Sequence, residues 1–133
     1  MPKSIFLTAT QRGSGKSSVA LGLTSLLERT IGNVGYFKPV GRRPDGGPDP
    51  DVLLMKQALA LEAAEEEIQL FTMDDVAESL ADGTNDQLLE QVMDGYARIE
   101  SSVDFVVCEG TDYFGAMAAF ESNVNAEISK NLG

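Results

Sequence analysis

The stretch LTATQRGSGKSSVALG, residues 7–22, constrains the fold more than any other part of the chain. An apolar run at residues 3–8 overlaps its start and predicts a buried strand. Apolar side chains at helical spacing follow it and predict a helix over residues 16–30. A Gly-Lys-Ser sequence between a strand and a helix is typical of a phosphate-binding loop, because backbone N–H groups and the helix N-terminus point at the ligand. An ordinary Gly/Ser-rich turn is the alternative, and Thr10 stands where the usual motif has its first glycine.

The residue types in this loop match what a nucleoside triphosphate needs. Gly13 and Gly15 let the backbone curl tightly, with no Cβ atom in the way. Lys16 supplies a positive charge for the β- and γ-phosphates, and Ser17 supplies a hydroxyl ligand for Mg²⁺. We therefore predict that ATP or another nucleoside triphosphate binds with Mg²⁺ at these residues: Thr10, Arg12, Gly13, Ser14, Gly15, Lys16, Ser17 and Ser18.

Strand and helix patterns alternate along the rest of the chain. Strands are predicted at residues 34–38 and 104–110, with a short extended piece at 68–72. Helices are predicted from Pro50 to about Glu66, over 73–81 up to Gly83, over 85–101, and over 122–133. This order predicts an α/β fold of three layers with a mostly parallel sheet, similar to a P-loop NTPase. A ligand then lies beyond the carboxyl ends of the strands.

Charged residues stand where these strands end or where the next helix begins. Glu109 ends the apolar run FVVCE, where a carboxylate can hold Mg²⁺ directly or through water; an acid facing solvent is the alternative. Lys38 follows the second strand and is aimed at the same crevice, or is a strand-end charge in water. Asp51 is a second carboxylate for Mg²⁺, or complements a helix dipole. The predicted metal ligands are thus Ser17, Asp51 and Glu109, and the predicted catalytic cations are Lys16 and Lys38.

The charges are unevenly distributed along the chain, whose formal net charge is −11. Residues 1–56 hold eight Lys/Arg and four Asp/Glu, a balance of +4, whereas residues 57–133 hold two and seventeen, a balance of −15. Arg12, Arg42 and Arg43 belong to the first part and can meet phosphate or substrate carboxylates. Surface solvation is the alternative, and we favour it for Arg43. The acidic remainder argues against a nucleic-acid partner and is explained by a solvated surface.

Length and composition indicate one cytoplasmic domain over residues 1–133. The chain of 133 residues is long enough for one real core, and no apolar stretch approaches a membrane span. Its single cysteine, Cys108, lies in an apolar run and suits a reducing compartment. Without any histidine, zinc sites and histidine-based triads are excluded.

Four segments together resemble the dethiobiotin synthetase branch of P-loop proteins: TATQRGSGKSS, YFKPVG, PDPDVLLM and VVCEGTD. That branch has a longer spacing before Gly-Lys-Ser and a leading Gly-Thr, to which Ala9 and Thr10 correspond. The resemblance implies that Lys38 belongs to a Lys-Pro-Val motif and that Ser17, Asp51 and Glu109 bind Mg²⁺. The chain departs from the synthetase after Glu109, where Tyr113 and Phe114 replace small residues and paired glycines. It departs inside the loop as well, at Gln11 and Arg12.

A closer resemblance extends over nearly the whole chain. The segment VVCEGTDYFGAMAAFESNVNAEISKNLG is similar to the N-terminal domain of the long form of phosphate acetyltransferase. That resemblance implies an accessory role in assembly or metabolite control, beside an acetyltransferase domain and within a homo-oligomer. An ATP-dependent enzyme that activates a carboxylate or a carbamate, as dethiobiotin synthetase does, is the alternative.

The strand count predicts a truncated fold. Three strong strands are found, and the chain stops at Gly133 after a helix that should lead to a fourth. In this branch of folds the phosphate-loop strand is central, so its apolar outer edge would be unpaired. We therefore expect a fragment of a longer chain, with this edge covered by a partner chain or a rearranged segment. The alternative is that residues 68–72 supply the missing strand, although they suit the far edge of the sheet better.

Overall fold

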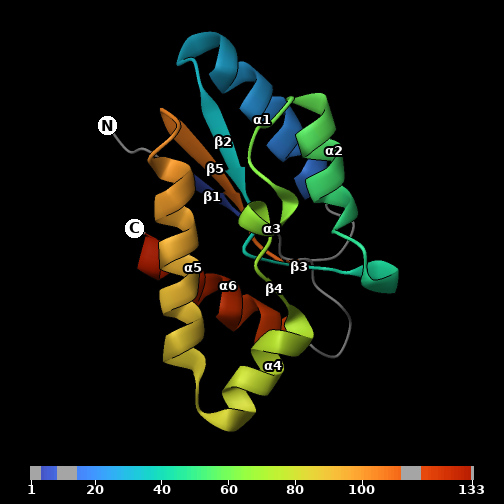
Figure 1. Cartoon of the computed structure of the whole chain (residues 1–133), viewed down its shortest axis with the longest axis vertical. Helices are drawn as coiled ribbons and strands as arrows, with labels where there is room; N and C mark the ends of the chain where they lie inside the picture. The colour runs from blue at the N-terminus through green and yellow to red at the C-terminus, as the bar shows by residue number, and fades with distance from the viewer. Residues whose placement is uncertain (1–3, 9–14, 112–117, 133) are drawn as a thin grey trace.

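A parallel sheet runs through the middle of the molecule. The computed structural model describes residues 4–8, 15–111 and 118–132, with only the backbone for 118–124. Three strands, β1 (Ser4–Leu7), β2 (Val34–Phe37) and β5 (Phe105–Glu109), form the sheet in the order β1-β5-β2. The register pairs Leu7 with Glu109 and Phe37 with Cys108, so the three strands end at the same edge (Figure 1). The predicted α/β class with a parallel sheet is confirmed.

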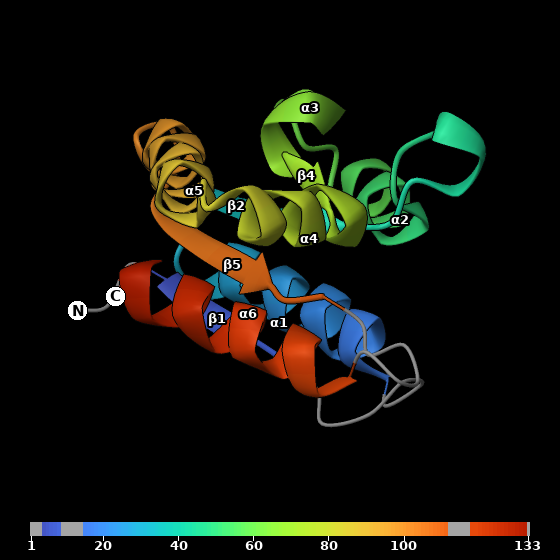
Figure 2. The same cartoon turned by 90° about the horizontal axis from the view of Figure 1, so that it is seen from below.

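Helices cover both faces of this sheet (Figure 2). On one side, α1 (Lys16–Thr30) and α2 (Pro50–Ala58) pack against it, with the short α3 (Glu65–Ile68) beside them. On the other side lie α5 (Asn85–Glu100) and α6 (Ala118–Leu132), with α4 (Met73–Asp82) near the carboxyl ends of the strands. The arrangement has the three layers that the alternating pattern predicts.

Alternation along β5 divides its side chains between two cores. Val106 and Cys108 pack with α5 and α6, while Val107 packs with α1 and α2. All three are at most 1% exposed, and burial raises the pKa of the Cys108 thiol to about 12. Successive residues of a strand point to opposite faces. Glu109, two residues after Val107, therefore faces the α1 side, where the phosphate-loop helix begins.

The helix predicted from Pro50 to about Glu66 begins at the right residue, but its predicted C-terminal end is wrong, because α2 stops at Ala58. The chain reverses there in the left-handed conformation, with Ala60 at φ 49. The Leu61 N–H then donates to the Lys56 carbonyl over 3.1 Å, the long-range hydrogen bond of a Schellman helix end. Glycine usually fills that left-handed position, so an alanine there gives no warning in the sequence. The turn also lets Leu59 and Leu61 pack against the core on this face.

The extended segment predicted at 68–72 forms part of a second sheet. Its residues Phe71–Thr72, strand β4, pair in parallel with β3 (Val40–Gly41) in a two-stranded sheet. Its position beside the continuation of β2 excludes the alternative that it pairs with β1. Within the described residues β1 is therefore an edge strand, and Ile5 on it is 39% exposed.

Helix ends agree with the local signals in two further places. Gly83 closes α4 at φ 72, and Thr72 with Asp75 forms a capping box at its start. The last helix begins at Ala118, four residues before the predicted start, because alanines extend it towards the N-terminus. Among the described residues, no helix combines the length and apolar character needed to cross a bilayer.

The close approach of α5 to β2 can be tested at Gly35. A Cβ atom at this position would lie 2.9 Å from the Cγ2 atom of Ile99 and 3.2 Å from that of Val103. We expect Gly35→Ala to lower the free energy of unfolding by about 1–3 kcal/mol, the usual cost of overpacking. Urea unfolding followed by circular dichroism measures the change.

Gly22→Ala is the matched control, because a Cβ atom at this exposed position of α1 meets nothing within 4 Å. It should stabilise the chain by about 0.5–1 kcal/mol, as alanine does over glycine in helices. Equal effects of the two variants would contradict the packing described for β2 and α5.

Candidate functional site

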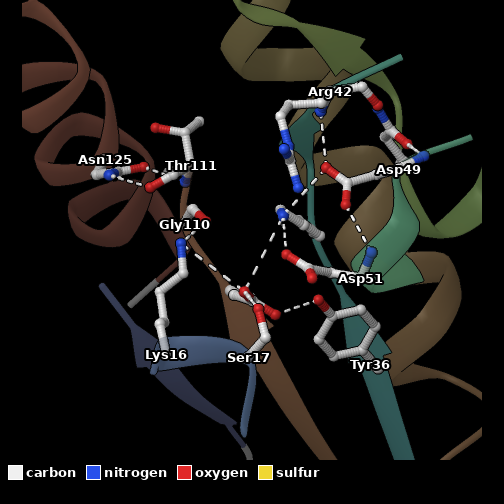
Figure 3. A network of polar contacts seen from close by, with 12 residues as sticks. Lys16, Ser17, Tyr36, Arg42, Asp49, Asp51, Gly110, Thr111 and Asn125 are labelled. Atoms are coloured by element: carbon white, nitrogen blue, oxygen red, sulfur yellow. Dashed lines mark hydrogen bonds and ion pairs between the residues drawn. The ribbon is translucent and has the colours of Figure 1, made fainter. Parts of the chain in front are cut away.

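Residues from four parts of the chain meet beyond the carboxyl end of β5 (Figure 3). Lys16 and Ser17 come from the first turn of α1, Lys38 follows β2, Asp51 lies in the first turn of α2, and Glu109 ends β5. The sequence predicts these five as catalytic or metal-binding residues, and the structure brings all of them together.

Glu109 is the centre of this group, and it is fully buried. Its Oε1 atom accepts a hydrogen bond from the Ser17 hydroxyl over 3.2 Å, and its Oε2 atom accepts one from the Tyr36 hydroxyl. The Nζ atoms of Lys16 and Lys38 lie 3.7 and 4.0 Å from Oε1. Burial raises the pKa of Glu109, while Lys38, the Tyr36 hydrogen bond and Lys16 act in the opposite direction. Burial and the Glu109 charge together raise the pKa of Tyr36 well above its usual value.

Lys16 lies across the end of β5 instead of extending into solvent. It is 8% exposed, and its ammonium donates to the Gly110 carbonyl over 2.7 Å. Gly15 immediately before it has φ 81, a left-handed conformation that favours glycine. This turn lets the chain enter α1 with Lys16 directed at the strand end.

Lys38 joins the three carboxylates of the site. Its Nζ atom lies 2.9 Å from Asp51 Oδ2, 3.1 Å from Asp49 Oδ2 and 4.0 Å from Glu109 Oε1. Burial alone would lower its pKa, but the charges of Glu109, Asp49 and Asp51 raise it. Conversely, burial raises the pKa of Asp51, yet its hydrogen bond and ion pair with Lys38 give a net lowering. The Ser17 hydroxyl also lowers the Asp51 pKa, so it lies near Asp51 as well as Glu109.

Asp49 holds the loop that carries Asp51. It is fully buried, its Oδ1 atom accepts from the Asp51 N–H over 2.8 Å, and its Oδ2 atom accepts from the Arg42 N–H over 2.7 Å. The side chain of Gln69 closes the loop by accepting from the Asp49 N–H at 3.0 Å and donating to the Arg42 carbonyl at 2.9 Å. Asp49 is also the N-cap of α2, as expected for an aspartate that stands before a helix beginning with proline. Its contact with Lys38 has no such local signal in the sequence.

A buried amide from α6 connects the ends of β1 and β5. Asn125 accepts a hydrogen bond from the Thr111 N–H over 2.8 Å and donates to the Thr8 hydroxyl over 3.3 Å. Its Oδ1 atom would lie 2.7 Å from a Cβ atom at Gly110, so only glycine fits there without a shift.

Sequence reasoning missed four polar residues here: Tyr36, Gln69, Thr111 and Asn125. Tyr36 has the clearest signal, because it stands two residues before Lys38 in an apolar strand and therefore shares its face. The other predicted binding residue that the structure describes, Ser18, is exposed on α1. Several predicted or discussed positions lie outside the described residues: Thr10, Gln11, Arg12, Gly13, Ser14, Tyr113 and Phe114.

The side chains of Ser17, Asp51 and Glu109 offer a hydroxyl and two carboxylates, the hard oxygen donors that Mg²⁺ takes. Among the side chains of residues 4–8, 15–111 and 125–132, no three His, Cys, Asp or Glu are arranged to hold a metal by themselves. Mg²⁺ is usually bound by one or two carboxylates together with water and substrate phosphates. The residues present fit a magnesium ion that binds together with phosphate.

The relatives of this chain are named phosphate acetyltransferases. The protein of Nitratidesulfovibrio vulgaris is 37% identical over 134 residues, which cover 100% of this chain and 19% of that protein. The protein of Synechocystis sp. is 32% identical over 133 residues, 99% of this chain and 19% of its own length. The protein of Pseudomonas aeruginosa is 31% identical over 129 residues, 96% of this chain and 18% of its own length. The chain thus spans about a fifth of these relatives, at their N-terminal part, and the predicted resemblance is confirmed.

A protein family described as an AAA domain matches residues 3–133. The match begins at the first strand and includes the phosphate loop, Lys38, Asp51 and Glu109. Together with the parallel sheet and the position of Lys16 at the start of α1, it leads to one conclusion. This chain belongs to the AAA domain family of P-loop proteins.

Proposed function

We propose that this chain is an accessory domain of a phosphate acetyltransferase, and that it binds ATP or another nucleoside triphosphate together with Mg²⁺. The observation that carries the proposal is the meeting of Lys16 and Ser17, at the start of α1, with Glu109 at the end of β5. A lysine and a hydroxyl at a helix N-terminus, opposite a strand-end carboxylate, provide what a magnesium-bound polyphosphate requires.

The phosphates would lie at the N-terminus of α1, where backbone N–H groups and the helix dipole favour negative charge. Lys16 is already held at this end by the Gly110 carbonyl, from which its ammonium would turn to donate to a phosphate oxygen. Lys38 provides a second ammonium near Glu109. We assign these two lysines to the terminal phosphates, whose negative charge their ammonium groups would offset.

Ser17, Asp51 and Glu109 would hold the magnesium ion. When bound, Mg²⁺ would neutralise part of the phosphate charge. In the structure, Lys38 neutralises Asp51 and lies near Glu109, so cation binding at these carboxylates would loosen the hold on the Lys38 ammonium. Lys38 would then be able to turn towards the nucleotide.

The accessory role rests on the relatives, which are named phosphate acetyltransferases and are matched over only about a fifth of their length. Acetyl transfer from acetyl-CoA to phosphate would then belong to another domain, and this chain would contribute assembly or metabolite control. A homo-oligomeric state and a cytoplasmic location stay predictions of the sequence. The alternative, a carboxylate- or carbamate-activating enzyme, has no support from the relatives.

The first test removes Lys16. We expect Lys16→Ala to weaken Mg·ATP binding at least about tenfold, because a charge-assisted hydrogen bond contributes roughly 1.5–3 kcal/mol. Isothermal titration calorimetry measures the affinity, and circular dichroism establishes that the variant is folded. Lys130→Ala, at an exposed position of α6, is the control and should bind as the unchanged chain does. A folded Lys16→Ala chain with undiminished affinity would rule out the site.

The second test removes the charge of Glu109 while keeping its shape. Glu109→Gln should make ATP binding independent of Mg²⁺, whereas the unchanged chain should bind ATP more tightly with Mg²⁺ than with EDTA. Because burial raises the Glu109 pKa, the neutral amide should leave the fold intact. Glu127→Gln, exposed on α6, is the matched control. Persistence of the full magnesium effect in Glu109→Gln would show that this carboxylate is not a ligand.

The third test separates the two neighbouring aspartates. Asp49→Asn weakens a buried acceptor of two backbone N–H groups, so we expect a loss of about 1–3 kcal/mol in the free energy of unfolding. Asp51→Asn should cost less stability, because its side chain is partly exposed, and should weaken the magnesium dependence of ATP binding. Urea unfolding and calorimetry measure the two effects. If Asp51→Asn leaves magnesium dependence unchanged, Asp51 serves only to pair with Lys38.

A further inference from the structure

A cavity of about 310 Å³ lies next to the predicted nucleotide site and is bordered by Lys38. Three segments form most of it: the turn after β3, the start of α4 and Thr111, two residues after β5. The residues that line it and carry the argument are Arg42, Arg43, Thr72, Met73 and Thr111. Lys38 and Asp49 also border it, so the cavity and the nucleotide site share one wall.

The charges around this cavity favour an anion. Arg42 and Arg43 contribute two positive charges, against the carboxylate of Asp74, while Lys38 and Asp49 on the shared wall pair with each other. Asp49 is already fully engaged, because it pairs with Lys38 and accepts from two backbone N–H groups. Asp74 is exposed in the first turn of α4, where it complements the helix dipole.

A neighbouring cavity shows the opposite character. It has a volume of about 650 Å³ and shares Arg43 and Thr72 with the smaller one, and its charged lining residues besides Arg43 are Asp75, Glu78 and Asp82. Three carboxylates repel an anion from that larger opening. Electrostatics therefore directs a small anion into the cavity beside Lys38.

The remaining wall residues indicate an organic anion. Pro44 and Met73 offer apolar contact for a carbon skeleton, which an inorganic ion lacks. Thr111 is 2% exposed, and its hydroxyl oxygen is buried with no hydrogen-bond partner among the described residues. Buried hydroxyl groups are nearly always hydrogen-bonded, so the Thr111 hydroxyl is suited to form a hydrogen bond with a polar group of a bound ligand. The volume lies at the lower end of ligand cavities, which suits a compact molecule.

We propose that this cavity binds a small organic carboxylate. The guanidinium groups of Arg42 and Arg43 receive its carboxylate, since their planar fork of N–H donors matches two carboxylate oxygens. The Thr111 hydroxyl bonds a polar group of the same molecule, and Met73 packs on its carbon chain. The site is distinct from that of the nucleotide, and its occupancy does not require a nucleotide to bind.

Succinate, a compact dicarboxylate, is the probe. We expect its titration into the ¹⁵N-labelled chain to shift the amide resonances of Gly41, Thr72 and Thr111 in a saturable way. Parallel titrations with inorganic phosphate and with sodium chloride, at matched ionic strength, should not shift these amides. Absence of a saturable succinate shift there overturns the proposal, and so does an equal response to phosphate.

Two variants locate the binding site. Arg42→Met keeps the backbone hydrogen bonds of Arg42 with Asp49 and Gln69 and should weaken succinate binding at least about tenfold, and Arg43→Met should weaken it too. Arg98→Met, exposed on α5, is the matched control and should bind normally. Unchanged affinity in both Arg42→Met and Arg43→Met would refute the assignment. The Lys16→Ala variant should bind succinate as the unchanged chain does, although its affinity for Mg·ATP is reduced. The proposed carboxylate site and the proposed nucleotide site are thereby tested separately.

Discussion

The burial of the Glu109 carboxylate is the constraint on which the rest of the site depends. A carboxylate with no exposed surface is costly unless donors surround it. Here the donors come from α1 through Ser17 and from β2 through Tyr36, with two ammonium groups within 4.0 Å. Both α1 and β2 must therefore be fixed relative to β5. The parallel sheet achieves this, because β2 pairs directly with β5 on one side and β1, the strand that precedes α1, pairs with β5 on the other. The requirement to solvate one strand-end acid thus determines where the phosphate-loop helix begins.

The same group has an imbalance of charge that favours a cation. In their ordinary ionised forms, Glu109, Asp49 and Asp51 carry three negative charges, against the two positive charges of Lys16 and Lys38. Asp49 is tied to the backbone of its own loop, and this leaves Asp51 and Glu109 as the carboxylates with capacity for another partner. The division between a structural and an available aspartate follows from burial, since Asp49 is fully buried and the side chain of Asp51 is 16% exposed.

Local sequence patterns predicted most elements of this fold but only part of its site. Strands and helices followed from apolar periodicity, and the strand-end residues Lys38 and Glu109 followed from topology. Tyr36 and Glu109 are 73 residues apart, and Asp49 and Gln69 are 20 apart, so their hydrogen bonds depend on tertiary packing that no local pattern contains. The early end of α2 was missed for a local reason: Ala60 occupies a left-handed position that usually signals itself with glycine.

Pro39 explains why an open site exists at this edge of the sheet. Pairing between β2 and β5 ends at Phe37 and Cys108, one residue before Glu109. Pro39 has no N–H to donate, and its carbonyl instead accepts from the N–H groups of Leu70 and Phe71 at 3.1 and 2.9 Å. After Pro39 the chain therefore leaves the main sheet and continues as β3, which pairs with β4. The end of β5 is left without a neighbouring strand on the β2 side. Lys38, held just before this change of partner, is directed at Glu109 on one side and borders the arginine-lined cavity on the other.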